Sequence, residues 1–299
     1  MRLTLSTLLR PPPPPTDPSP PSPATKADDE PAHLPPAAPP RTRRRRRGRL
    51  IALLAVAVTI WSVHGTGVGL ASLIEGREGA ARLLSGLFPP DLSGSLLSKV
   101  LTATLETLQI SITALFLGAA IGLPLGVLIA GNVRAPRWIA AGARVLAALL
   151  RGVPELLWAL LFVATVGLGP AAGVYAVALH AAGLLAKLSS EQMEAIDPGP
   201  VEAMRLTGAS RSATTLLAII PQSRNGIVSL LFYQWECNIR SSAVVGFVGA
   251  GGIGQALGIA LSLFRYDELA TLLITVLILV LGVDQISRWL RRALGAETR

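Results

Sequence analysis

Long apolar segments, spaced along residues 50–290, constrain this chain more than any other feature. The first, residues 50–69, contains no Asp, Glu, Lys or Arg over 20 residues, the length that a helix needs to cross a hydrocarbon core of about 30 Å. Further spans are expected at about residues 104–130, 144–166, 171–188, from 225 onward, and 269–286. We therefore predict an all-α integral membrane protein with six transmembrane helices.

The basic residues between these spans predict how the chain is oriented. Six spans place both termini on one side of the membrane. The segments on that side, 41–49, 131–144, 187–225 and 288–299, hold 18 Lys and Arg residues, whereas the outer loops, 70–100 and 249–268, hold 4. Because basic segments stay on the cytoplasmic side, both termini and residues 187–225 are expected in the cytoplasm, where ATP is available.

The net charge of +9 raises the question of nucleic-acid binding, and the position of the arginines argues against it. Seven of the 27 basic residues lie in residues 41–49, directly before the first span, which is typical of a cytoplasmic anchor. No aromatic residues interleave with these arginines, as they do in many nucleic-acid sites. Residues 1–40 are rich in proline, and we predict that residues 1–48 form a disordered, proline-rich and basic cytoplasmic tail.

A polar interruption between the fourth and fifth spans, residues 194–221, has the signals of a short surface helix. Asp197 can cap the free N–H groups of the first turn, in which Pro198 and Pro200 lack an N–H at little cost. Gly208 can end the helix in a left-handed conformation. One side of this helix is apolar (Val201, Ala203, Met204 and Leu206) and the other is charged (Glu202 and Arg205). A small helix with a charged outer face suits docking against another protein.

This interruption resembles the EAA loop of ABC importer permeases, the coupling helix that inserts into a cleft of the ATPase subunit. The matching residues are Glu202, Ala203, Gly208 and Pro221, whereas Met204 replaces the second alanine of the motif, and Ala218 and Ile220 occupy the family's Ile and Leu positions. The segment ECNIRSSAVVGFVGAGGIG (236–254) is similar to the matching segment of phosphonate permeases, more than to other permeases of the class. The stretches RGVPELLWALLF (151–162) and EAIDPGPVEAMRLTGAS (194–210) are also similar to phosphonate permeases.

The resemblance implies a type-1 permease fold over residues 101–291, with the coupling loop at 191–221. A first transmembrane helix and outer loop, 49–100, would precede it, and a cytoplasmic end, 292–299, would follow. The function implied is the pathway subunit of an importer for phosphonate or a related phosphorus oxyanion. The implied partners are a separate cytoplasmic ABC ATPase, an extracytoplasmic substrate-binding protein and, because only six spans are present, a second copy of the chain. Methionine is the alternative substrate, because its permeases share the glycine-rich segment.

Polar residues in the fifth span are the candidates for the translocation path. Glu236, Asn238 and Arg240 lie in its middle, and ionisable groups at membrane depth usually face a partner or a water-filled path. Glu236 and Arg240 are one turn apart, so a structural ion pair and a translocation role are both open. For a phosphonate, Arg240 would attract the anion and Asn238 would be a neutral donor. Arg151 and Glu155, four residues apart in the third span, are also expected to offset each other.

Two groups of glycines predict close backbone packing. Gly118, Gly122 and Gly126 recur every fourth residue of the second span, which makes a flat ridge for another helix. The second group consists of Gly249, Gly251, Gly252 and Gly254. Its G-x-G-x-x-G spacing also occurs in dinucleotide-binding turns, but no alternation of strands and helices surrounds it here. A tight re-entrant turn or a close helix contact is predicted instead.

Enzymatic chemistry finds little support in the sequence. None of the three lysines follows a glycine, so the chain lacks a P-loop. The single cysteine and three scattered histidines have no metal-ligand spacing, and His180, inside an apolar span, is expected to pack or to face the pore. We predict no enzyme activity, cofactor or metal. An ion-coupled secondary transporter would explain Glu236 and Arg240 but not the surface helix.

Overall fold

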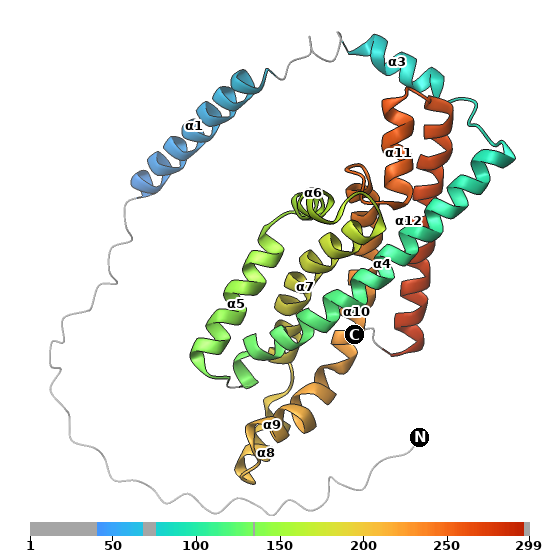
Figure 1. Ribbon diagram of the computed structural model, residues 1–299. Coiled ribbons are helices and arrows are strands. Elements are labelled where there is room, and N and C mark those ends of the chain that lie inside the picture. The colour runs from blue at the N-terminus through green and yellow to red at the C-terminus, as the bar shows by residue number, and fades with distance from the viewer. Residues whose placement is uncertain (1–40, 68–75, 134, 296–299) are drawn as a thin grey trace, which may run out of the picture. The chain divides into compact units, whose positions relative to one another are not determined.

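The computed structural model describes residues 41–67, 76–133 and 135–295, and every regular element in these ranges is a helix (Figure 1). The chain divides into two units, residues 1–72 and 73–299. The described part of the first unit is α1 (Arg41–Thr66). The basic run 41–48 is therefore helical, contrary to the predicted tail, because arginine favours helix and the run continues into the first apolar span. The disorder predicted for residues 1–40 falls outside the described residues.

The second unit is a bundle built around α7 (Pro170–Glu194), which packs against α4, α5, α6 and α10. Figure 1 shows α8 and α9 at one end of this unit and α3 and α11 at the other. The remaining elements, in chain order, are α3 (Arg77–Gly86), α4 (Gly94–Ile129), the 3₁₀ turn η2 (Gly131–Val133), α5 (Arg137–Gly152), α6 (Glu155–Val166), α8 (Pro198–Leu206), α9 (Arg211–Thr214), the π-helical turn η3 (Thr215–Ile219), α10 (Ile220–Gly246), α11 (Gly252–Ser262) and α12 (Tyr266–Ala293).

By length and composition, five of the described helices can cross a membrane: α1, α4, α7, the continuous run Arg211–Gly246, and α12. Helices α5 and α6 pass the same test only as a pair, and they meet at an angle of 86°. The all-α membrane fold is confirmed, and the predicted six spans are present when this bent pair counts as one.

The straight third span predicted at residues 144–166 is wrong, because the helix breaks at Val153 and Pro154. Val153 has an extended backbone, with φ −86° and ψ 122°. Proline has no N–H to donate and disfavours the helical conformation of the residue before it. The sequence Gly152-Val153-Pro154 therefore contained the signal for the break.

The glycine ridge predicted in the second span is confirmed as the contact between α4 and α7. A Cβ atom built on Gly122 would lie 2.6 Å from the carbonyl oxygen of Ala182, and one on Gly118 would lie 3.1 Å from that of Ala178. The facing residues of α7 are themselves small. The two backbones therefore approach closely over about two helical turns, as small residues allow in membrane bundles.

The second group of glycines connects α10 to α11. Gly249, Gly251 and Gly252 have positive φ values of 87°, 84° and 68°, a region that L side chains rarely adopt. Gly254 faces Gly246, since a Cβ built on Gly254 would lie 2.9 Å from the Gly246 Cα. The first turn of α11 is fixed to α4, because the Ile253 N–H donates to the Thr107 hydroxyl at 2.8 Å. The segment is therefore a tight turn followed by a close helix contact.

Candidate functional site

The short helix predicted in the polar interruption is present as α8, Pro198–Leu206. The Asp197 carboxylate accepts from the Gly199 N–H at 3.0 Å, which satisfies one of the free donors of the first turn. Pro198 and Pro200 lie in that turn, as predicted. Gly208 has a φ of 79° and follows the helix end, where a left-handed residue closes the last turn.

Helix α8 has one buried and one exposed face. Val201 is buried in a cluster with Ala130, Met193, Ala218 and Ile219. Glu202 and Ala203 are exposed, Met204 is half-buried, and the Leu206 residue is 89% exposed. The prediction that Leu206 lies on the packed apolar side is therefore wrong. The exposed face combines a carboxylate with a large apolar side chain, which is a surface suited to a protein partner.

The α4–α5 corner, residues 130–133, is bonded to the end of α7 and to α8. The Gly131 N–H donates to the Glu194 carboxylate at 2.7 Å, and the Asn132 amide donates to the Met193 carbonyl at 2.6 Å. The Arg205 guanidinium donates to the Asn132 carbonyl at 2.6 Å. Arg205 therefore points toward this corner, contrary to the prediction that it belongs to the charged outer face. These three bonds join residues more than 60 positions apart.

Pro221 lies at the start of α10, directly after the π-helical turn Thr215–Ile219. Proline cannot donate to the preceding turn, and the helix nevertheless continues without interruption from Arg211 to Gly246. Ala218 and Ile219 of the π turn are buried under α8. The π turn just before Pro221 therefore packs α8 against the start of the long helix.

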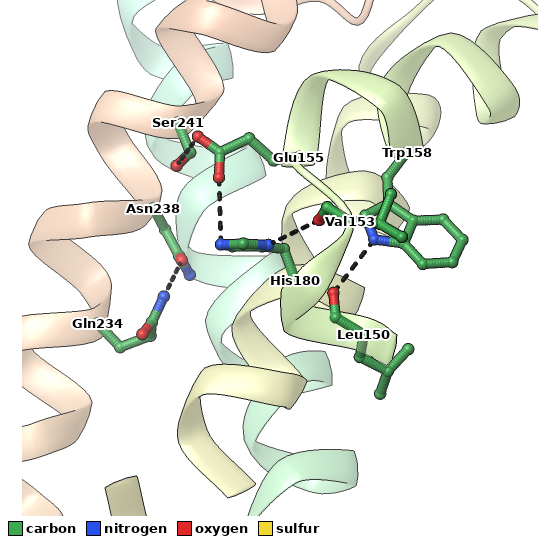
Figure 2. A network of polar contacts seen from close by, with 8 residues as sticks. All are labelled: Leu150, Val153, Glu155, Trp158, His180, Gln234, Asn238 and Ser241. Atoms are coloured by element: carbon green, nitrogen blue, oxygen red, sulfur yellow. Dashed lines mark hydrogen bonds and ion pairs between the residues drawn. The ribbon is translucent and has the colours of Figure 1, made fainter. Parts of the chain in front are cut away.

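A network of polar side chains lies where the α5–α6 bend meets α7 and α10 (Figure 2). The Ser241 hydroxyl donates to one oxygen of Glu155 at 2.9 Å, and His180 Nε2 lies 3.4 Å from the other oxygen. His180 Nδ1 lies 3.1 Å from the Val153 carbonyl oxygen. A carbonyl oxygen only accepts, so His180 donates from Nδ1 in this contact.

These contacts also satisfy backbone groups that the bend leaves free. The last carbonyls of a helix have no partner within that helix. At the end of α5, the Trp158 indole N–H donates to the Leu150 carbonyl at 3.2 Å. The Val153 carbonyl is in contact with His180 Nδ1. The predicted pairing of Arg151 with Glu155 is wrong, because the bend places the two residues on different helices. His180 is a partly buried partner of Glu155, a role that its spacing in the sequence does not indicate.

Of the three residues proposed for the translocation path, Glu236 and Arg240 line one pocket between α10 and α12, whereas Asn238 is not part of its wall. Asn238 is buried and donates to the Ser111 carbonyl of α4 at 3.3 Å, and its amide lies 2.9 Å from that of Gln234 (Figure 2). Glu236 forms an ion pair with Arg291 of α12, with 3.0 Å between the charged atoms. Arg240 is exposed, and its guanidinium lies 3.5 Å from the Cys237 sulfur. Of the two alternatives left open for Glu236 and Arg240, the ion pair between them is therefore not formed, because Glu236 pairs with Arg291 instead.

Metal binding finds no site in the part of the chain that the structure describes. Within it, no group of three or more His, Cys, Asp or Glu side chains is placed to hold a metal ion. The polar residues instead form pairs and short chains between helices.

Comparison with known proteins places these features in context. A family model described as "Binding-protein-dependent transport system inner membrane component" matches residues 122–299. The match spans more than half of the chain. It includes the bend, α8 and the helices on either side of it.

Two relatives and one solved structure are similar to this chain. The phosphite transport system permease protein PtxC of Stutzerimonas stutzeri is 37% identical over 221 residues, which cover 74% of this chain and 80% of that protein. The phosphate-import permease protein PhnE of Mycolicibacterium smegmatis is 37% identical over 193 residues, 64% of this chain and 36% of that protein. An inward-facing structure of the MetNI methionine ABC transporter matches with a TM-score of 0.61 and 25% identity, over 70% of this chain and all of that one.

Proposed function

Because the chain belongs to the family of binding-protein-dependent transport system inner membrane components, we propose that it forms the import pathway for phosphonate or a related phosphorus oxyanion. As a multi-pass permease subunit it contains no nucleotide-binding motif, and a separate ATPase supplies the energy. The observation that carries the proposal is α8, a capped helix whose exposed face presents Glu202, Ala203 and Leu206 at one end of the bundle.

The coupling role of α8 rests on how it is supported. Its buried face packs on α7 and on the π turn that begins the long helix, and Arg205 ties it to the α4–α5 corner. A partner that moves α8 therefore moves these elements with it, as a rigid shift of packed helices. Glu202, Ala203, Met204, Gly208 and Pro221 are the residues to which we assign this coupling.

The substrate assignment rests on the relatives and on the resemblance of the segments around Arg151 and Glu236. The names of the two relatives specify phosphite and phosphate import, and phosphonates share their tetrahedral oxyanion group. The structural match to a methionine transporter keeps methionine as the second candidate. A zwitterionic amino acid and a phosphorus oxyanion differ in charge, so competition between them in uptake separates the candidates.

The proposed arrangement places both termini and α8 in the cytoplasm, where the basic segments lie. The extracytoplasmic substrate-binding protein docks at the opposite end, near α3 and α11. Two copies of the chain form the pathway. Exposed apolar side chains along α5, α6 and α10 supply surface for the second copy and for lipid. Within the path, Arg240 is the proposed anion contact, whereas Asn238 and Glu236 hold α10 against α4 and α12.

Uptake of a labelled alkylphosphonate tests the proposal, in cells with and without this chain and with phosphite, phosphate and methionine as competitors. Loss of uptake on deletion, with competition by phosphorus compounds alone, is the expected result. Loss of methionine uptake with unchanged phosphonate uptake would overturn the substrate assignment but not the mechanism.

Coupling is tested separately, by co-purification of the ATPase with Glu202→Ala and Gly208→Val variants. Both variants are expected to detach the ATPase or to abolish uptake. Gly208 has open space around its Cα, so Gly208→Val acts through its positive φ and not through a clash. Uptake at the wild-type level in both variants would remove α8 from the coupling route.

A further inference from the structure

A pocket of about 430 Å³ lies between α4, α5 and α7, apart from the polar network of Figure 2. Three basic side chains line it, Arg144 and Arg151 from α5 and Lys187 from α7, together with Ser190 and Glu194. The rest of its wall is apolar and includes small residues of α5. The pocket therefore combines room for a small ligand with a concentration of positive charge that the mechanism proposed above does not use.

The two arginines follow one face of α5. They are seven residues apart, which is two helical turns, or about 10 Å along the axis. Arg151 lies in the last turn before the 86° bend, and Arg144 lies one turn further from the bend than Ala147 and Ala148. Because α5 is one half of a broken span, these charges run from the interior of the span toward its cytoplasmic end.

The acidic groups nearby are already engaged. Lys187 pairs with Glu191 at 2.8 Å, with both side chains about half exposed, and Glu194 accepts from the Gly131 N–H. Arg144 donates to the Ile129 carbonyl at 3.3 Å. Among the described residues, neither Arg144 nor Arg151 forms an ion pair, so the pocket keeps two guanidinium groups without an ion-pair partner, in a wall that also contains the Glu194 carboxylate.

An arginine inside a membrane span is costly unless it faces a partner or water. A planar guanidinium offers paired N–H donors that match the oxygens of a phosphoryl or phosphonyl group. Two arginines and a lysine line the cavity against one carboxylate, Glu194, so the charge of its wall favours an anionic ligand. The charge, the donor geometry and the position inside a span agree on one class of ligand.

We propose that this pocket binds a tetrahedral phosphorus oxyanion, and that it is the cytoplasmic half of the import route. This inference rests on the proposed function for the identity of the solute. The same chemistry is present in phospholipid head groups, which basic pockets between membrane helices also bind. Arg151 is the central residue, because it has no competing ion pair and lies beside the bend.

The test uses the purified permease–ATPase complex in phosphatidylcholine nanodiscs, with radiolabelled methylphosphonate as the probe. Wild-type complex is expected to retain the label, and Arg151→Gln is expected to lower its affinity by roughly tenfold or more, the order that one charged hydrogen bond contributes. Arg151→Lys should keep part of the affinity. Arg224→Gln, at an exposed arginine of α10 outside the pocket, is the matched control and should bind as wild type does.

Two further measurements complete the test. In proteoliposomes, Arg151→Gln should slow import while ATP hydrolysis stimulated by the binding protein continues, whereas a folding defect lowers both rates. The second measurement is mass spectrometry of the lipids that co-purify with the complex. If wild type retains an anionic phospholipid that Arg151→Gln loses, the ligand of the pocket is a lipid head group. Equal retention of methylphosphonate and of lipid by all variants would overturn the proposal. If wild type imports no phosphorus oxyanion, the proposed function fails, and the lipid measurement still decides whether the pocket binds a head group.

Discussion

Arg291 of α12 and Glu236 of α10 form an ion pair with 3.0 Å between Nη2 and Oε1, and their side chains are only 16% and 13% exposed. This pair joins the helix that follows the coupling segment to the last helix of the chain. The pair also gives Glu236, the acidic residue of the fifth span, a structural role.

The first prediction concerns this pair. Glu236→Gln leaves the Arg291 charge buried without a counter-ion and should lower the free energy of unfolding by about 3 kcal/mol. The thermal midpoint of the purified complex measures the loss. The control is Asp284→Asn, which breaks the more exposed Arg288–Asp284 pair and should cost about 0–1 kcal/mol. Equal shifts for the two variants would contradict a structural role specific to Glu236.

The second prediction concerns the glycine contact between α4 and α7. Gly122→Ala places a methyl group against the Ala182 carbonyl and the Leu185 side chain and should destabilise the protein by about 1–3 kcal/mol. Gly142→Ala makes the same change on α5, where nothing lies within 4 Å, and should be neutral or stabilising by up to about 1 kcal/mol. Thermal unfolding of both variants provides the comparison, and a stable Gly122→Ala protein would show that the helices can separate without cost.

The third prediction concerns the exposed face of α8. Burying a leucine at an interface contributes about 1.5–3 kcal/mol, so Leu206→Asp should weaken binding of the ATPase about tenfold or more. Titration of purified ATPase against the permease in detergent measures the affinity. Thr207→Asp adds the same charge at the neighbouring exposed position and should have a smaller effect. If both variants lose the same affinity, charge and not Leu206 determines docking.

The fourth prediction concerns His180. His180→Ala removes the partner of both Glu155 and the Val153 carbonyl, and should cost about 2 kcal/mol or more in the free energy of unfolding. Ser241→Ala removes one hydrogen bond to Glu155 and should cost about 1 kcal/mol. Uptake and thermal stability are measured together. A His180→Ala protein with wild-type stability would show that the bend does not depend on this contact.

The fifth prediction concerns Arg240. Arg240→Ala should abolish transport while the complex still assembles, because the side chain is exposed and forms no ion pair among the described residues. Arg265→Ala provides the comparison. Arg265 directly precedes α12 and pairs with Glu268 in the first turn of that helix, and the variant should transport normally. Uptake by the Arg240→Ala variant at the wild-type rate would remove this residue from the path.

Local signals in the sequence predicted much of the fold. The apolar spans, the glycine contact on α4 and the caps of α8 depend on residues within a few positions of each other, where periodicity and backbone preference decide the structure. The break at Pro154 belongs to the same class of signal. Apolar residues continue on both sides of this break, so the hydropathy pattern alone does not reveal it.

Contacts between distant residues could not be predicted in this way. Glu236 has Arg240 one turn away, yet its partner is Arg291, and Glu155 has Arg151 four residues away, yet it meets His180 and Ser241. Spacing along one helix identifies candidate partners on that helix only. The packing of helices brings in partners from other helices, and these are the ones that Glu236 and Glu155 contact. For the same reason, the bonds of Asn132 and the basic pocket at Arg144 and Lys187 were missed.

The bonds from the α4–α5 corner to the end of α7 and to α8 have a mechanical consequence. A push on α8 reaches α7 and α10 through the chain, and it reaches α4 and α5 through Glu194, Asn132 and Arg205. A displacement of α8 is thus transmitted to four helices, α4, α5, α7 and α10. The helix of this span is interrupted at Val153 and Pro154, and we expect this bend to let α5 swing while α6 stays in place.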